Sequence, residues 1–259
     1  MKEQGPPTPI PQPQQDEPWA ELRALTTARI ALPRSGASLA TAPLLDLRLA
    51  HARARDAVHA PLDEPRLISD LTSLGLPVLA VASAAADRTH YLMRPDLGRR
   101  LEGDAAARLA AHAGSGHDVA FVVADGLSAR AVETHAQPLL AQTLPRLAPW
   151  RIAPLVVVRQ GRVAIGDEVA TALRAEIAVV LIGERPGLSA PDSMGAYLTF
   201  RPTPHTTDAD RNCISNIRPE GLAYADAAVT LIHLLRAMRA RQISGVRLKD
   251  DRLLLEGRS

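Results

Sequence analysis

Three short apolar runs without polar alternation constrain the fold of this chain most strongly. They lie at residues 119–123, 155–158 and 177–182 and contain only valine, isoleucine, leucine, alanine and one phenylalanine. Strands with no polar face are buried on both sides, which is typical of a parallel sheet covered by helices. A further strand is expected at about 196–200. The sequence therefore predicts an α/β fold with a Rossmann-like open, mostly parallel sheet.

Helical spacing of apolar residues is found on both sides of these runs. A helix is predicted from Thr41 to a point before Pro61, because proline cannot continue a helix. A second helix is predicted over 64–74, and a closing helix over about 223–241. The segment 78–82 is a further candidate strand.

The composition changes along the chain and predicts three parts. Residues 1–26 begin with five prolines between positions 6 and 13 and little apolar surface, so we expect a disordered tail without a secretory signal. Residues 27–95 are predicted to form a small helical N-terminal domain. Residues 96–259 contain the three apolar runs and are predicted to form the Rossmann-like α/β domain.

The overall composition argues against several classes of protein. No run of 18 apolar residues is found, so we expect no membrane-spanning helix and no membrane partner. The single cysteine, Cys213, cannot form an internal disulfide, which favours the reducing cytoplasm. The net charge of +2 comes from dispersed arginines, and aromatic residues make up only 3% of the chain. This pattern argues against a nucleic-acid partner.

Three loops that follow the predicted strands combine glycine with charged residues. They are Asp125-Gly126, the segment 161–167 and the segment 183–187. Ligands of open α/β sheets bind beyond the carboxyl ends of the strands, so we expect a binding site formed by these loops. The chain contains no Gly-x-Gly-x-x-Gly, no Walker A and no Gly-x-Ser-x-Gly motif.

The residues alone leave the ligand open. One alternative is a magnesium-dependent phosphohydrolase, since carboxylates from several strand ends suit Mg²⁺. Its candidate ligands are Asp125, Asp167, Glu168, Glu184, Asp208 and Asp210. Cys213 is either a small buried apolar residue or part of a loop that faces a ligand.

Several longer stretches are more specific than these patterns. The most distinctive are Gly-Glu-Arg-Pro-Gly-Leu at 183–188 and Cys-Ile-Ser-Asn-Ile at 213–217. Further stretches of the same kind lie at 28–30, 34–38, 51–59, 91–99 and 123–129. Together they resemble the small (light) subunit of ethanolamine ammonia-lyase, in order and with similar spacing, over residues 27–247.

The resemblance implies an adenosylcobalamin enzyme that converts ethanolamine to acetaldehyde and ammonia by radical chemistry. It implies a hetero-oligomer with a large subunit, a TIM barrel that carries the substrate pocket and the catalytic acids and bases. This chain alone would then be inactive, with no catalytic residue and no metal ligand of its own. The implied location is the bacterial cytoplasm, and the family is often associated with bacterial microcompartments.

The resemblance also assigns cofactor contacts to three residues of this chain. Val163 is expected to pack against the corrin ring, Glu184 to accept a hydrogen bond from a side-chain amide or a ribose hydroxyl of the cofactor, and Cys213 to make a small apolar contact. Two alternatives stay open beside this interpretation. One is the magnesium-dependent phosphohydrolase, which would use Asp125, and the other is a structural partner that makes no cofactor contact.

Overall fold

The computed structural model describes residues 17–249. Contacts divide this part of the chain into two compact units, with the boundary between Ala52 and Arg53. The first unit contains helix α1 (Glu17–Ala24), a two-stranded hairpin and most of helix α2 (Thr41–His59). The hairpin pairs β1 (Arg34–Ser35) with β2 (Ser38–Leu39) in antiparallel register.

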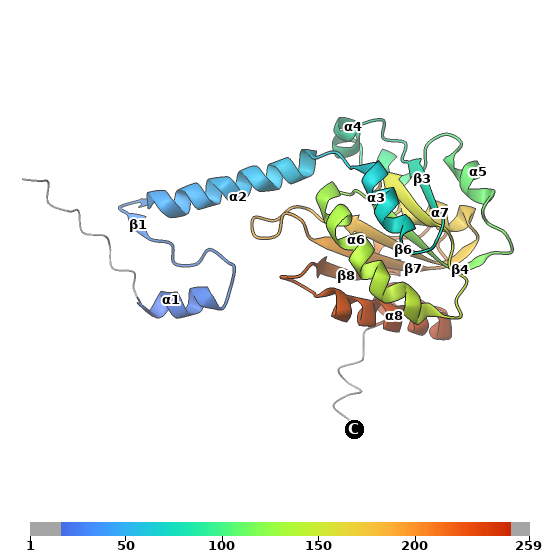
Figure 1. The fold of residues 1–259 in the computed structure, drawn as a ribbon. Coiled ribbons are helices and arrows are strands. Elements are labelled where there is room, and N and C mark those ends of the chain that lie inside the picture. The colour runs from blue at the N-terminus through green and yellow to red at the C-terminus, as the bar shows by residue number, and fades with distance from the viewer. Residues whose placement is uncertain (1–16, 250–259) are drawn as a thin grey trace, which may run out of the picture. The chain divides into compact units, whose positions relative to one another are not determined.

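The second unit is built on one six-stranded sheet (Figure 1). From one edge to the other its strands are β3 (Val78–Ala82), β5 (Leu155–Arg159), β4 (His117–Ala124), β6 (Ala175–Gly183), β7 (Met194–Phe200) and β8 (Arg211–Ile217). The first four are mutually parallel, whereas β7 is antiparallel to both β6 and β8.

Helices cover both faces of this sheet (Figure 1). One face packs against α3 (Glu64–Thr72), α6 (Ala129–Thr143) and α8 (Tyr224–Arg241). The other face packs against α5 (Ala105–Ala110) and α7 (Ile165–Ala172). The helix α4 (Arg88–Met93) and the 3₁₀ segment η1 (Leu97–Arg99) lie between β3 and α5 in the chain.

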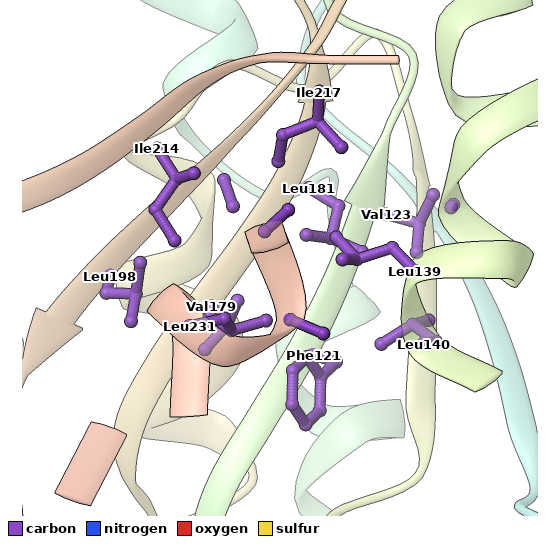
Figure 2. Close-up of a cluster of buried hydrophobic side chains, with 14 of the residues drawn as sticks. Phe121, Val123, Leu139, Leu140, Val179, Leu181, Leu198, Ile214, Ile217 and Leu231 are labelled. Carbon is purple, nitrogen blue, oxygen red and sulfur yellow. The ribbon is translucent and has the colours of Figure 1, made fainter. Parts of the chain in front are cut away.

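Alternate residues of each central strand supply two separate cores. In β4, Phe121 and Val123 belong to the cluster beneath α6 and α8, whereas Val122 belongs to the cluster beneath α7. Figure 2 shows Phe121 and Val123 gathered with Leu139, Leu140 and other apolar side chains of the first cluster. Because successive side chains of a strand point to opposite faces, a run with no polar residue fills both cores at once.

The α/β class and the mostly parallel sheet are therefore confirmed. The Rossmann-like layout is not confirmed, because the parallel strands stand in the chain order 1-3-2-4, whereas the dinucleotide-binding fold has the order 3-2-1-4. The predicted helices at 41–60, 64–74 and 223–241 and the predicted strands are present.

Other details of the sequence prediction have different outcomes. The sequence does not predict strand β8; a loop that faces a ligand is only one of the two alternatives it leaves open for Cys213. The predicted domain boundaries stay predictions. Helix α1 lies in the segment expected to be a disordered tail, of which residues 1–16 lie outside the described residues. None of the helices between residues 17 and 249 is long and apolar enough to cross a membrane.

Candidate functional site

A pocket of about 450 Å³ lies at the carboxyl edge of the parallel strands. After β4 the chain passes to α6 on one face of the sheet, and after the neighbouring β5 it passes to α7 on the other. Loops that diverge in this way leave a crevice between adjacent strand ends. The pocket is lined by Tyr91, Arg99, Leu127, Arg162, Val163, Ala164, Ile182, Gly183, Glu184, Arg185, Tyr197 and Asp208.

Asp125 joins the loops that follow β4 and β5. Its Oδ1 accepts a hydrogen bond from the Gly161 backbone N–H at 3.1 Å, and its Oδ2 lies 3.8 Å from Arg88 Nη1. The carboxyl group is buried, and this burial raises the pKa of Asp125 to about 6 against the opposing effect of hydrogen bonds and Arg88. Asp125 therefore holds the two loops together beneath the pocket and does not line it.

Arg88, the first residue of α4, links three segments near the strand ends. Its Nε donates to the Val58 carbonyl at 2.7 Å, and its Nη1 donates to the Gly126 carbonyl at 2.7 Å. The same Nη1 lies 3.4 Å from Gln160 Oε1. The end of α2 and the loops after β4 and β5 are thereby held around one guanidinium group.

Tyr91 and Arg162 form one wall of the pocket. The Arg162 guanidinium carbon lies 4.4 Å from the centre of the Tyr91 ring, and Nη2 donates to the Tyr91 carbonyl at 2.9 Å. Arg162 N–H also donates to the Gly98 carbonyl at 2.8 Å. Burial raises the pKa of Tyr91 to about 12, so its phenol is neutral at pH 7.

Glu184 follows β6 and projects toward β8. Its two carboxylate oxygens lie 3.3 and 3.2 Å from the Asn216 backbone N–H, which donates to them. A Cβ atom at Gly195 would lie 3.0 Å from Glu184 Oε1, so glycine leaves the room that this side chain occupies. One N–H uses only part of the accepting capacity of a carboxylate, and Glu184 keeps lone pairs for a ligand.

Cys213 lies directly opposite Tyr197 in the β7–β8 ladder. The residue is exposed, yet desolvation of its sulfur raises the pKa of the Cys213 thiol against the lowering effect of a hydrogen bond with Tyr197. The pKa of Tyr197 is also raised, chiefly by burial. Both groups are therefore neutral at pH 7.

The structure brings two of the three predicted site residues together at the carboxyl edge of the parallel strands, whereas Cys213 lies within β8. Val163 and Glu184 both line the pocket. Cys213 does not line it, but lies beside Tyr197, which does. Sequence reasoning missed Tyr91 and Tyr197 as lining residues.

Arg99 was also missed as a lining residue, and Arg162 was covered only as part of the predicted binding loop 161–167. The available signals were weak. Arg162 directly follows Gly161 in a loop that was predicted to bind, and Tyr91 and Arg99 belong to one of the family-like stretches.

The six acidic residues considered as magnesium ligands do not form one cluster. Both Asp167 oxygens accept hydrogen bonds from Arg211 at 2.7 Å, and Glu168 Oε2 accepts from the Leu101 N–H at 2.7 Å. Asp210 accepts hydrogen bonds from Thr207. Between residues 17 and 249, no three histidine, cysteine, aspartate or glutamate side chains are placed to hold a metal ion. Nothing in the described geometry favours the phosphohydrolase.

Fold and pocket together define an α/β protein with a candidate binding site where its parallel strands end. The family model of the ethanolamine ammonia-lyase light chain matches residues 16–249. The ethanolamine ammonia-lyase small subunit of Azotobacter vinelandii is 55% identical over 244 residues, which cover 92% of this chain and 90% of the relative.

Two further relatives bear the same name. That of Pseudomonas fluorescens is 55% identical over 240 residues and covers 90% of this chain and 87% of its own length. That of Ralstonia nicotianae is 54% identical over 238 residues, with coverage of 90% and 88%. The chain belongs to the ethanolamine ammonia-lyase light chain family.

Proposed function

We propose that this chain is the small subunit of an adenosylcobalamin-dependent ethanolamine ammonia-lyase, which converts ethanolamine to acetaldehyde and ammonia. In this proposal the pocket covers one part of the cofactor, and the large subunit, a TIM barrel, covers the rest. The observation that carries the proposal is the position of the site residues in this chain, which belongs to the family. Val163 and Glu184 line one pocket, and Cys213 lies beside the lining residue Tyr197.

The residues of the pocket fit a corrinoid. A corrin ring is a broad apolar surface with amide side chains around its rim, and it is larger than the ligands that pockets of this volume enclose. Leu127, Val163 and Ile182 supply an apolar lining, while Glu184 supplies hydrogen-bond acceptors that amide groups require. An open pocket of about 450 Å³ therefore suits one part of such a ligand.

Each of the three contact residues then has a definite task. Val163 packs on the ring, and Glu184 accepts hydrogen bonds from an amide or a ribose hydroxyl while Asn216 holds its carboxylate in place. Cys213, as a neutral thiol, makes an apolar contact. When bound, the cofactor supplies the radical that starts the reaction; the chain positions it and excludes water.

The proposal leaves the catalytic acids and bases to the large subunit. The pocket holds no nucleophile paired with a base, and the Asp125 carboxyl group is engaged with Gly161 beneath it. We further propose a hetero-oligomer in the bacterial cytoplasm, packaged in a microcompartment where the host forms one. Its relatives are named small subunits, which supports a large subunit as the partner.

The cofactor contact is tested with Glu184→Gln in the purified complex of both subunits. Losing a charge-assisted hydrogen bond should weaken adenosylcobalamin binding by about 1–3 kcal/mol, measured by equilibrium dialysis. Glu176→Gln is the matched control, because Glu176 stands at the opposite end of the same strand, where it pairs with Arg201. Equal affinity of wild type and Glu184→Gln would favour a purely structural partner.

The subunit assignment is tested by co-expression with a candidate large subunit. The two chains should co-purify and release acetaldehyde from ethanolamine only when adenosylcobalamin is added. The small chain alone should show no turnover. Acetaldehyde release by the small chain without its partner would contradict the proposal.

A further inference from the structure

Three arginines line the pocket: Arg99 from η1, Arg162 from the loop after β5 and Arg185 from the loop after β6. They come from segments far apart in the chain and meet only through the fold. The family-based contacts give them no role, although Arg162 and Arg185 lie in loops that the sequence predicts to bind a ligand. Their common position therefore needs an explanation of its own.

Some arginines close to Arg99 in the chain pair with an acidic residue. Arg94 pairs with Asp96 at 2.7 Å, and Arg108 pairs with Glu102 at 3.1 Å. By contrast, no ion pair within 4.0 Å joins Arg99, Arg162 or Arg185 to a carboxylate among the described residues. Their charges are left to be balanced by something else.

The two acidic residues that line the pocket, Glu184 and Asp208, form no ion pair with these arginines. Glu184 accepts from the Asn216 backbone, and Asp208 Oδ1 lies 3.6 Å from Arg211 Nε. Arg162 is also held in a fixed position, because it stacks on Tyr91 and donates one hydrogen bond through Nη2. Its Nε is buried without a hydrogen-bond partner, so its donors are not all used within the described part of the chain.

We propose that Arg99, Arg162 and Arg185 form an anion subsite that binds a phosphate diester. Guanidinium groups match phosphate oxygens in geometry and stay charged at every physiological pH. The inference rests on the proposed function: the corrin amides of a cobalamin are neutral, and the phosphodiester of its nucleotide loop is its negatively charged group. The subsite therefore receives the nucleotide loop, while Val163 and Glu184 contact the ring.

Two corrinoids that differ in this group test the subsite. Cyanocobalamin carries the nucleotide loop with its phosphodiester, and cyanocobinamide lacks both. The affinity of the purified two-subunit complex for each is measured by equilibrium dialysis, without reference to turnover. Arg162→Gln should weaken cyanocobalamin binding by about tenfold or more, and leave cyanocobinamide binding unchanged.

Further variants guard against misfolding and non-specific effects. Arg185→Gln and Arg99→Gln change exposed side chains and should show the same selective loss at smaller size. Arg201→Gln is the matched control, because Arg201 also stacks on an aromatic ring, Phe200, but at the other end of the sheet. It should change neither affinity.

The outcomes separate this inference from the function on which it rests. Equal losses for both corrinoids, or no loss with any of the three variants, would overturn the subsite while the cofactor assignment stands. A wild-type complex that binds neither corrinoid would overturn the proposed function and the subsite together. A selective loss for cyanocobalamin supports both.

Discussion

The two halves of the large sheet are held by different forces. In the parallel half, β4 and β6 contribute side chains that are almost wholly buried and apolar. At the antiparallel margin, β8 exposes Cys213 and carries two asparagines and an arginine. Burial of apolar surface dominates the first half, whereas the second adds hydrogen bonds and one ion pair to the buried Ile214 and Ile217 of β8. The site lies where the two halves meet.

Each polar residue of β8 fixes a different neighbour. Arg211, whose side chain is 3% exposed, donates two hydrogen bonds to Asp167 of α7 and one to Thr199 of β7. Asn212 joins the strand to Gly245 and Leu248. Asn216 donates its N–H to Glu184. These polar contacts fix the margin in addition to the buried Ile214 and Ile217 of the same strand.

Removing the acidic partner of Arg211 should have the largest effect. Asp167→Ala leaves a buried guanidinium group without its bidentate carboxylate, so we expect a loss of about 3–5 kcal/mol in the free energy of unfolding. The measurement is urea unfolding followed by circular dichroism.

Asp70→Ala is the matched control for this change. Asp70 forms a 3.8 Å ion pair with Arg66 on the surface, and its loss should cost about 0–1 kcal/mol. Replacing both buried partners, as in Asp167→Leu with Arg211→Met, should restore most of the stability. Equal losses for Asp167→Ala and Asp70→Ala would show that the margin does not depend on its ion pair.

Asp125 is a buried acidic residue of the parallel half. Its replacement is expected to raise the free energy of unfolding, whereas the replacement of Asp167 lowers it. The pKa of its carboxyl group is about 6 in the folded chain, against 3.8 as the ordinary value. Between these two pH values the folded state binds more protons than the unfolded state, so the free energy of unfolding falls as pH rises toward 6. Asp125→Asn keeps an acceptor for Gly161 and should remove this loss.

The stability of Asp125→Asn relative to wild type should therefore increase between pH 4 and pH 7. The gain should reach about 1–3 kcal/mol, as urea unfolding at a series of pH values would show. Asp104→Asn changes an exposed carboxylate and should follow the wild type at every pH. A constant difference between Asp125→Asn and wild type across this range would contradict the assignment.

The parallel half could be predicted from sequence because its signal is local. Residues 119–123 are apolar without exception, and such a run has one favourable environment, a strand covered on both faces. Strand β8 has no such signal. Its Arg-Asn-Cys-Ile-Ser-Asn-Ile segment neither alternates nor forms an apolar run, and it becomes a strand through pairing with β7 and through distant polar partners.

The site was predictable to the same limited extent. The loops after β4, β5 and β6 could be placed together because parallel strands end at one edge. Tyr91 and Arg99 lie more than 60 residues before Arg162 and do not directly follow a predicted parallel strand. The contribution of Tyr91 depends on the stacking of Arg162 on its ring, a long-range contact that no local pattern encodes.

A smaller loss is expected from a single polar residue at the margin, Asn212. Asn212→Ala removes the acceptor of the Gly245 N–H at 2.7 Å and the donor to the Leu248 carbonyl at 2.7 Å. Leaving these groups unpaired should cost about 1–3 kcal/mol in urea unfolding. Asn212→Asp keeps the acceptor and loses the donor. Comparing its loss with that of Asn212→Ala therefore separates the contributions of the two hydrogen bonds. No loss with either variant would show that the Asn212 contacts do not hold the margin.

The smallest effect is expected from a conservative change in the parallel half. Ile177→Val removes one methyl group from a side chain that is 1% exposed, and it should cost about 0.5–1.5 kcal/mol in urea unfolding. Val229→Ala, on an exposed position of α8, should change stability by no more than about 0.5 kcal/mol. If burial of apolar surface stabilises the parallel half, the loss in free energy of unfolding should scale with the buried apolar volume that is removed. If Ile177→Val instead cost as much as Asp167→Ala, the division of the sheet into an apolar half and a polar margin would not hold.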